Sequence, residues 1–341
     1  MYNNNNKKRG HAVALFSGGL DSILSVLLVM RQNIEVTAIT FMTHFGCDIE
    51  DRSGCGSNPY PMAEKFGFNV KLMHLGQKFI DIVKAPKHGY GKNLNPCIDC
   101  RLLMLSEAKL FKEMIGADFV ITGEVLGQRP KSQRRDAMMF VDRKSGLDGY
   151  LVRPLSAKLF PETMPEKSGL LDRNLLENIT GRSRKRQMQL AKEFGVTDYP
   201  SPAGGCLLTE PSYTNRLRDL MHYDKDFGFV DLNLLRQGRH FRLSDKVRII
   251  VGRNEKDNDK IESMAQENHL VFEAREAGSP ITILIGEPSD EEIKLAAAIT
   301  ARYSSARNEP EVEITYIKNR VDNKLKIEPA DPEEIEKYQI K

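Results

Sequence analysis

The sequence predicts an α/β protein: a parallel sheet with helices on both faces, followed by a helical middle segment and a small C-terminal α+β domain. Three observations predict it. Short apolar runs alternate with helix-length stretches from residue 11 to about 155, prolines and glycines gather at 153–169, and a second alternation begins near 241. With 341 residues, 40% of them hydrophobic, the chain is long enough for two or three domains with cores.

The first region reads as strands joined by crossover helices. The run 11–16 is apolar, as a buried strand would be, and 20–32 has apolar residues at helical spacing. Because such alternation favours parallel pairing, we expect one parallel sheet. Its expected elements are strands at 11–16, 34–42, 69–75 and 118–123, helices at 20–32 and 101–115, and a short helix after residue 61.

The rest of the chain divides by composition. We expect a first domain at 1–165, a helical basic segment at 166–240, an α+β domain at 241–320 and a charged tail at 321–341. Within them we expect helices at 170–195, 211–236 and 289–305, and strands at 246–252, 269–276, 280–286 and 312–317. The tail is expected to be loosely held.

Composition excludes several classes of protein. No apolar run reaches the roughly 18 residues of a membrane span, and the N-terminus lacks an apolar leader, so we expect a cytoplasmic protein with no membrane partner. A net charge of +3 demands no nucleic acid by itself. Five cysteines without an export signal favour metal or redox use over a disulfide scaffold.

A glycine-rich turn follows the first strand. Ser17-Gly18-Gly19-Leu20-Asp21-Ser22 lies where a parallel sheet binds ligands, at the start of the next helix. Bare backbone N–H groups at Gly18 and Gly19, with hydroxyls at Ser17 and Ser22, suit phosphate oxygens. The turn is neither a Walker A loop nor GxGxxG, because no Gly-Lys-[Ser/Thr] follows.

This turn resembles the loop of the PP-loop ATP pyrophosphatase superfamily, whose members split ATP between the α and β phosphates. The resemblance implies that the loop holds pyrophosphate while AMP passes to a carbonyl-type oxygen. It also implies ATP and Mg²⁺ as cofactors, with Asp21 helping to position the metal ion.

The positions of the cysteines indicate which nucleophile would displace AMP. Cys97 and Cys100 form a CxxC expected just before a helix, and Cys206 follows the proline- and glycine-rich loop 199–205. Three thiolates can hold three irons of a [4Fe–4S] cluster and leave the fourth open for sulfide. The arrangement resembles tRNA thiouridylases of the superfamily, which use such a cluster, and 2-thiouridine synthases described as persulfide-forming. Persulfide chemistry and structural zinc stay open as alternatives.

Three further residues near the second strand carry weaker signals. Cys47 and Cys55 fit no standard metal spacing, so they are interpreted as incidental thiols rather than a sulfur relay. His44, at the end of that strand, could face a nucleotide, although a plain loop histidine fits as well.

Basic residues gather in two segments. The loop after the strand 118–123 offers Gly123 and Gly127 for close approach and Gln128 for the nucleotide, and a second basic run follows at 182–186. A solvated basic surface is the alternative in both cases. The expected RNA contacts here are Arg129, Lys131, Arg134, Arg182, Arg184, Lys185 and Arg186.

The C-terminal region, with Gly252-Arg253-Asn254 and Asn258-Asp259, resembles the RNA-binding domain of the NFACT ribosome-associated proteins. The resemblance implies phosphate contacts, of which Arg253 is the first candidate. It departs from that family in having no tryptophan. Further candidates are Lys256, Arg302, Arg307 and Lys318.

Together these features predict an ATP-dependent tRNA thiolase. It would adenylate a uridine carbonyl oxygen, and sulfur held by the three cysteines would displace AMP. Its partners would be tRNA and a sulfur donor: a cysteine desulfurase, a sulfur carrier or free sulfide. The alternatives are a superfamily ligase using ammonia or an amine, and a non-catalytic RNA-binding factor.

Overall fold

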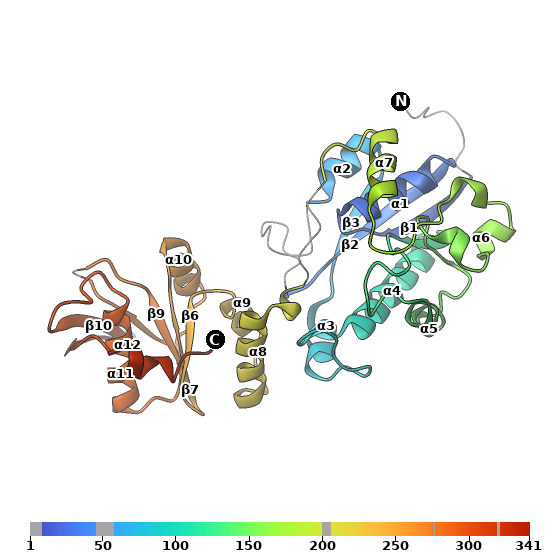
Figure 1. Cartoon of the computed structure of the whole chain (residues 1–341). Coiled ribbons are helices and arrows are strands. Elements are labelled where there is room, and N and C mark those ends of the chain that lie inside the picture. Colours follow the sequence, from blue (N-terminus) through green and yellow to red (C-terminus); the bar gives the residue numbers. More distant parts are fainter. Residues whose placement is uncertain (1–8, 46–57, 200–205, 276, 319–320) are drawn as a thin grey trace. The chain divides into compact units, whose positions relative to one another are not determined.

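The computed structural model divides the chain into two compact units, residues 1–209 and 210–341 (Figure 1). The structure describes residues 9–45, 58–199, 206–275, 277–318 and 321–341. The boundary between the units falls inside the expected segment 166–240, so residues 166–209 belong to the first unit and 210–240 to the second. Among the described residues, no helix is long and apolar enough to cross a membrane.

The first unit is built on a five-stranded parallel sheet, which confirms the predicted fold class. The strand order is β3-β2-β1-β4-β5, and each neighbouring pair runs parallel. The chain therefore builds outward from β1 through β2 to β3 and then returns to β4 on the other side. Its strands are β1 (Gly10–Leu15), β2 (Ile34–Met42), β3 (Asn69–His74), β4 (Phe119–Thr122) and β5 (Leu151–Val152).

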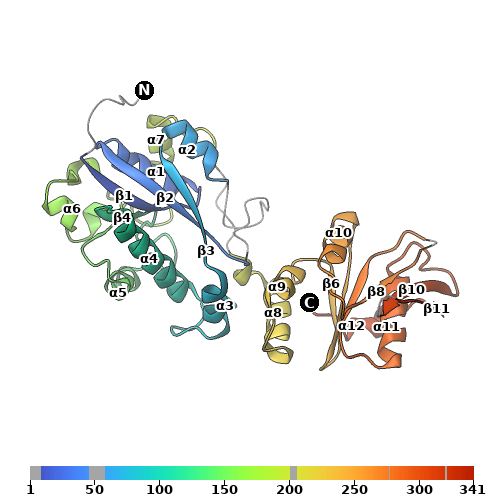
Figure 2. The same ribbon diagram turned by 180° about the vertical axis from the view of Figure 1, so that it is seen from behind.

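Helices cover both faces of this sheet, as the alternation predicted (Figures 1 and 2). Helix α1 packs on β1, β2 and β4, and its partner α7 packs on α1, whereas α4 packs on β1 and β4. The helices of the unit are α1 (Leu20–Met30), α2 (Tyr60–Phe66), α3 (Gly76–Lys84), α4 (Cys97–Met114), α5 (Arg135–Ser145), α6 (Met164–Lys167) and α7 (Lys185–Glu193), with 3-10 turns at 157–159, 173–175 and 207–209.

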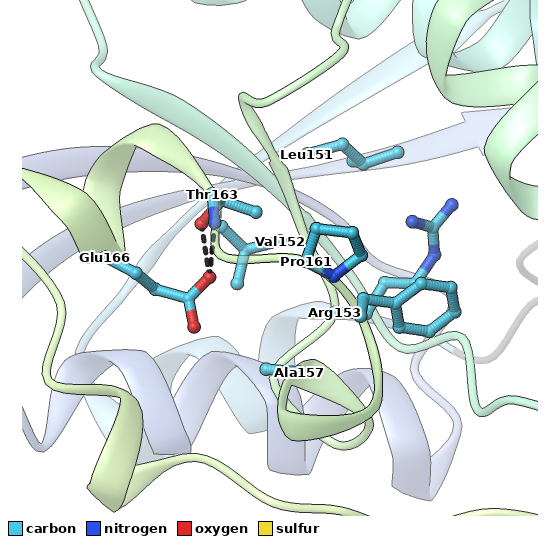
Figure 3. A pocket seen from close by; sticks show the side chains of 8 residues that line it. Leu151, Val152, Arg153, Ala157, Pro161, Thr163 and Glu166 are labelled. Atoms are coloured by element: carbon cyan, nitrogen blue, oxygen red, sulfur yellow. Dashed lines mark hydrogen bonds between the residues drawn. The ribbon is translucent and has the colours of Figure 1, made fainter.

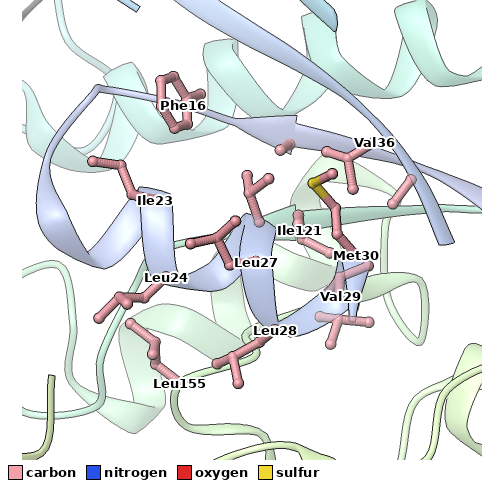
Figure 4. Packing of buried hydrophobic residues seen from close by; sticks show 14 of the residues in the cluster. Phe16, Ile23, Leu24, Leu27, Leu28, Val29, Met30, Val36, Ile121 and Leu155 are labelled. Carbon is pink, nitrogen blue, oxygen red and sulfur yellow. The ribbon is translucent and has the colours of Figure 1, made fainter. Parts of the chain in front are cut away.

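The core of the unit forms around α1, whose sequence is apolar on every side except its first turn. Leu24, Leu27 and Leu28 are fully buried and meet residues from β1, β4 and the segment after β5 (Figure 4). A helix apolar all round is typical of one enclosed between a sheet and further helices. This packing fixes the glycine loop, because the loop joins β1 directly to α1.

The middle of the chain is less helical than the sequence predicted. Only α7 and one 3-10 turn form within 170–195, because Glu177 N and Ile179 N donate to Pro154 O and Leu155 O and Thr180 bridges Leu126. The helix expected at 211–236 is two helices, because the side chain of Asp224 accepts a hydrogen bond from Asp226 N in a turn and Gly228 starts the next helix.

The second unit holds a six-stranded sheet, β11-β10-β8-β9-β7-β6, in which neighbours are antiparallel. Helix α11 packs on one face, and Ile250 and Ile283 pack on the other with Leu234 and Ile261 from two helices. Its elements are α8 (Pro211–Tyr223), α9 (Phe229–Leu234), β6 (Arg239–Ser244), β7 (Val247–Val251), α10 (Glu255–Ser263), β8 (Leu270–Glu273), β9 (Thr282–Gly286), α11 (Asp290–Arg302), β10 (Val312–Lys318), β11 (Val321–Ile327) and α12 (Pro332–Glu336).

The last twenty-one residues are not the loosely held tail that the sequence predicted. Strand β11 pairs along the whole of β10, and Ile335 of α12 is buried in the core of the unit. Residues 338–340 run beside β6, where Tyr338 O accepts from Arg242 N and Ile340 N donates to His240 O. The sequence pattern did not indicate a strand here, because β11 is an edge strand and has charged and polar residues on its exposed face.

Candidate active site

The glycine loop, Ser17 to Ser22, leaves the carboxyl end of β1 and begins α1. Gly18 has φ +72°, in the region that favours glycine, and Gly19 caps α1 in extended conformation without a side-chain cap. Ser22 Oγ donates to Gly19 O at 2.8 Å, which braces the turn, while Ser17 is exposed. The start of α1 is therefore available to an anion, with the helix dipole favouring one.

Asp21 lies in the first turn of α1, and one of its oxygens lacks a partner. Gln128 Nε2 donates to Asp21 Oδ2 at 3.0 Å, whereas Oδ1 is buried and accepts no hydrogen bond from any described residue. A buried carboxylate oxygen without a partner is costly. Mg²⁺ suits this position, because it commonly takes only one or two protein carboxylates together with substrate phosphates.

The loop after β4 lies against the glycine loop. A Cβ on Gly123 would come within 2.8 Å of the backbone of Asp21 and Ser22, so only glycine fits there. Gly127 has φ +75°, and its N–H donates to Gln133 O at 2.7 Å, which turns the chain back. Strands β1 and β4 flank the point where the strand order reverses, and open parallel sheets bind ligands at such a point.

The cysteine pair lies inside a helix, not before it as the sequence predicted. Cys97 is the first residue of α4, and Cys100 N donates to Pro96 O at 2.8 Å, so both belong to the first turn. Both thiols are half-buried. A Cβ on Gly91 would lie 3.3 Å from Cys97 Sγ and 3.7 Å from Lys131 Cδ, which places the thiol and that lysine stem around the same glycine.

The turn that carries Cys206 is attached to the loop that precedes Cys97. Leu94 N donates to Leu208 O at 3.1 Å, and Asn93 Nδ2 donates to Thr209 O at 2.8 Å. The Cys206 thiol donates to the carbonyl of Phe45, just past the carboxyl end of β2, over 3.6 Å. Both described cysteine-bearing segments thus lie along the edge of the sheet from which the glycine loop emerges.

The predicted three-thiolate cluster site is not formed by the described residues. No three Cys, His, Asp or Glu side chains among them make a group that could hold a metal ion. The residues present therefore do not fit a [4Fe–4S] cluster or a closed zinc site as the structure stands. Cys47 and Cys55 lie outside the described residues.

A buried network of four charges, which sequence reasoning missed, lies beside the cysteine pair. Glu124 accepts from Arg153 Nε at 3.1 Å and from Thr122 Oγ1 at 3.1 Å, and it pairs with Arg101 Nε at 3.1 Å. Arg153 also binds both oxygens of Asp142, at 2.6 and 2.8 Å. Isolated charged residues in helices and loops gave no sign of this convergence.

Burial and pairing act against each other in this network. Burial raises the pKa of Glu124, but the charges of Arg101 and Arg153 outweigh it and hold the pKa below the usual value. For Asp142 burial prevails, and the pKa is raised despite the hydrogen bonds from Arg153. The network therefore keeps Glu124 ionised as a fixed acceptor at the carboxyl end of β4.

Three histidines also lie at this edge of the sheet, and His88 is the one bound beside the cysteine pair. Asp99, between Cys97 and Cys100, is buried and accepts from His88 N at 2.9 Å and from the His88 ring at 2.8 Å. His44 stacks edge-on against His74, with ring centroids 4.5 Å apart at the ends of β2 and β3. His44 thus faces another histidine at this edge of the sheet.

The two predicted basic segments of the first unit lie side by side. Leu126 bridges Thr180, and Gly181 N donates to Leu126 O at 2.7 Å, so the loop after β4 runs along the residues that lead into α7. The exposed basic side chains of this surface, which we call the basic rim, are Arg129, Lys131, Arg134, Arg182 and Lys185.

Three predicted RNA contacts are engaged differently. Arg186 binds Glu177 at 2.7 Å and Glu193 at 3.0 Å, and its hydrogen bond to Glu177 is the main cause that raises its pKa. Arg184 is the N-cap residue of α7 and is half-buried. In the second unit, Arg253 pairs with Asp257 at 2.5 Å but stays 45% exposed at its side chain.

A small cavity near β5 is not part of this site. It encloses only about 10 Å³, the room for one water, between Val152, Ala157 and the Thr163–Glu166 cap (Figure 3). Thr163 N and Oγ1 both donate to Glu166 Oε2, at 2.8 and 2.6 Å. This corner stabilises the chain after β5 and is too small for a nucleotide.

Two family models match the chain in succession. Residues 7–157 match the family described as thiamine biosynthesis protein (ThiI), and residues 238–339 match the NFACT protein RNA binding domain. The first unit carries a ThiI-type domain, and the second an NFACT-type domain. The glycine loop, the cysteine pair and the loop after β4 all lie within the ThiI-type domain, while Cys206 lies beyond its matched residues.

Relatives match parts of the chain over parts of their own length. A Thermococcus kodakarensis protein named "Probable tRNA sulfurtransferase" is 28% identical over 43% of this chain and 37% of its own. The Pelotomaculum thermopropionicum tRNA-specific 2-thiouridylase MnmA is 26% identical over 67% and 63% respectively. The chain thus spans less than two thirds of either relative.

Among solved structures, a 4-thiouridine synthetase in complex with RNA and bound ATP covers 55% of this chain and 52% of its own. It is 19% identical with a TM-score of 0.35, a level that supports no inference about this protein.

Proposed function

We propose that this protein is an ATP-dependent tRNA sulfurtransferase, which activates a uridine carbonyl oxygen with AMP and then replaces it with sulfur. The observation that supports the proposal most is the set of groups found together at one edge of the ThiI-type sheet. There the glycine loop, the unpartnered oxygen of Asp21 and the segments bearing Cys97, Cys100 and Cys206 occur together. Curated relatives named for tRNA thiolation support it.

The first half of the reaction is activation. The backbone N–H groups at the start of α1 would bind the β and γ phosphates of ATP, and Gln128 orients Asp21 by its hydrogen bond. Mg²⁺, held by Asp21 Oδ1 and the phosphates, would offset the charge that develops on pyrophosphate. Activation is needed because a pyrimidine carbonyl oxygen is a poor leaving group and AMP is a good one.

The second half is sulfur transfer, for which we propose a persulfide, since it needs no preformed group of three ligands. The terminal sulfur of a Cys206 persulfide, supplied by an external sulfur donor, attacks the activated carbon. The C–S bond forms as the C–O bond to AMP breaks. A thiolate of Cys97 or Cys100 then attacks Cys206 Sγ, which breaks the S–S bond and releases the thiouridine. The resulting disulfide is reduced by an external dithiol.

Substrate binding would use the basic rim beside the glycine loop. Five exposed cations in two adjacent segments suit the phosphates of a tRNA backbone. The NFACT-type domain would add a second RNA contact through Arg253, whose guanidinium is held by Asp257 and half exposed.

The decisive test is the variant Cys206→Ala, assayed with tRNA, ATP, Mg²⁺, a persulfide-bearing cysteine desulfurase with cysteine as the sulfur donor, and a dithiol. We expect thiouridine to fall by at least about 100-fold, because this thiol carries the transferred sulfur, while the tRNA-dependent release of pyrophosphate, which precedes sulfur transfer, still occurs. Mass spectrometry of tRNA nucleosides measures the product, and Cys55→Ala is the control. Normal thiolation by Cys206→Ala would refute the assignment.

Elemental analysis tests the form of the sulfur. We expect protein purified without oxygen to lack stoichiometric iron and acid-labile sulfide, and a mass increase of about 32 Da on Cys206 after incubation with the sulfur donor. Iron at three or four atoms per chain would replace the persulfide with the cluster that the cysteine pattern predicted.

A further inference from the structure

Two consecutive residues after β4 contact both halves of the candidate active site. The backbone of Gly123 lies against Asp21 and Ser22 of the glycine loop, where even a Cβ would come within 2.8 Å. The next residue, Glu124, pairs with Arg101 of α4 at 3.1 Å. The end of β4 is therefore a short, rigid connection between the glycine loop and the helix that carries the cysteine pair.

Glu124 is well suited to be the fixed end of this connection. Its side chain is 4% exposed and is also held by Arg153 and by Thr122. Arg153 is in turn locked onto Asp142 of α5 by two hydrogen bonds. These hydrogen bonds fix the position of the Glu124 carboxylate. A side chain that binds its other oxygen is therefore held at a fixed place relative to the sheet.

Arg101 is the group that binds this oxygen, and it directly follows Cys100. The first turn of α4 begins at Cys97, and its N-cap residue, Pro96, gives no side-chain hydrogen bond, so the backbone N–H groups at this end are not capped. The Arg101–Glu124 pair attaches that turn to the end of β4. The side chain of Arg101 is 25% exposed, whereas Glu124 and Arg153 are buried and pair with each other. Removing Arg101 therefore leaves that buried pair in place.

We infer that Arg101 is a positioning residue for sulfur transfer: through Glu124 it holds the turn bearing Cys97 and Cys100 at a fixed place relative to the glycine loop. The inference rests on the proposed function and deepens it. Arg101 acts through the helix turn and not on the nucleotide, so its loss should separate the two halves of the reaction.

The test compares Arg101→Gln, Arg101→Lys and the control Lys78→Gln. Lys78 of α3 pairs at 2.7 Å with Glu107 of α4, the helix that also carries Arg101. The control therefore also removes one ion pair from α4, at a residue ten positions after Cys97. For each protein, loaded with persulfide and in excess over tRNA, the AMP and the thiouridine formed in a single turnover are measured in the same reaction. A misplacement of about 1 Å in a reacting group can cost about 100-fold in rate.

We expect Arg101→Gln to lower thiouridine formation about 10- to 100-fold with AMP formation changed less than about 3-fold, so that the ratio of AMP to thiouridine rises. Arg101→Lys should restore part of the loss, and Lys78→Gln should match the wild type. An unchanged ratio in Arg101→Gln, whether both products fall together or neither falls, would overturn the inference. A wild type that forms no thiouridine would instead refute the proposed function.

A second measurement does not depend on activity. Hydrogen exchange of the backbone amides at 98–103 should be at least about 10-fold faster in Arg101→Gln than in the wild type, with the amides of 107–113 unchanged. Equal protection in the first turn of α4 would show that Arg101 does not hold it and would overturn the inference even in an inactive protein.

Discussion

Asp21 is the residue on which the activation half depends. It has one oxygen bound by Gln128 and one buried oxygen without a partner among the described residues. A merely structural aspartate within the first turn of a helix would turn its second oxygen to water. The arrangement instead fits a carboxylate that waits for a cation brought with phosphates.

The variant Asp21→Asn should therefore lose activation. We expect tRNA-dependent release of AMP and pyrophosphate to fall by about 100-fold, because an amide binds Mg²⁺ far less well than a carboxylate does. Asp81→Asn is the control, since Asp81 is an exposed residue of α3 whose side chain accepts from Gln77. The release of pyrophosphate is measured over a range of Mg²⁺, and a wild-type rate in Asp21→Asn at low Mg²⁺ would contradict the role.

The basic run 182–186, which leads into α7, contains residues with different roles. Arg186 faces back onto Glu177 and Glu193, whereas Arg182 and Lys185 are exposed. An arginine already bound to two carboxylates has little charge left to attract a phosphate. We therefore assign Arg186 to stability and keep Arg182 and Lys185 as the RNA-facing members.

The double variant Arg182→Ala/Lys185→Ala should weaken tRNA binding in proportion to two lost phosphate contacts. We expect the slope of log K against log salt to become less steep by about 2, with little loss of stability. Arg186→Ala should do the opposite, leaving the slope unchanged and lowering the free energy of unfolding by about 1 kcal/mol. Binding titrations at several salt concentrations distinguish these outcomes, and an equal slope for both variants would contradict the division.

The NFACT-type unit uses most of its motif residues for its own structure. A Cβ on Gly252 would collide with Asn258 Oδ1, and Asn258 bonds both Ser279 O and Ile281 N. Asp257 accepts from Gly238 N and from Arg253. The motif therefore fixes the turn between β7 and α10, and Arg253 is its member with a surface left for a ligand.

On the scale of the whole molecule, stability should depend on pH through His240. This histidine of the second unit is buried, and desolvation, reinforced by Arg216 and Arg248, lowers its pKa well below the ordinary 6.5. Below pH 6.5 the unfolded chain binds a proton that the folded chain does not bind. Stability should therefore be level with respect to this group above pH 6.5 and fall as the pH drops below it.

We expect the free energy of unfolding to fall by up to about 1.4 kcal/mol per pH unit from this group between pH 6.5 and 5. His240→Gln should be less stable at pH 7.5, because it disturbs the bond to Gln237 O, yet less sensitive to acid. Denaturant unfolding at several pH values measures the slope. A variant with the wild-type slope would show that another group is responsible.

Local pattern was enough to predict strands β1 to β4 of the parallel sheet, the helices α1, α2 and α4, and the glycine loop, whereas β5, α3 and α5 were not predicted. A buried parallel strand is apolar throughout and an enclosed helix is apolar at helical spacing, and both signals can be read along the chain. The glycine loop is readable because one short segment carries every group that it needs. For the same reason the pair Cys97 and Cys100 stood out, although the start of α4 was placed four residues too late.

Long-range partners decided the rest. The sequence by itself determined which residues could do chemistry: the glycine loop, the three cysteines and the basic runs. Only the tertiary structure decided that Glu124 binds Arg101, that Arg186 is occupied by carboxylates and that residues 321–341 complete a sheet. The reason is that charge pairs and edge-strand pairing depend on which segments contact each other in the folded chain. The periodicity of the sequence does not indicate those long-range contacts.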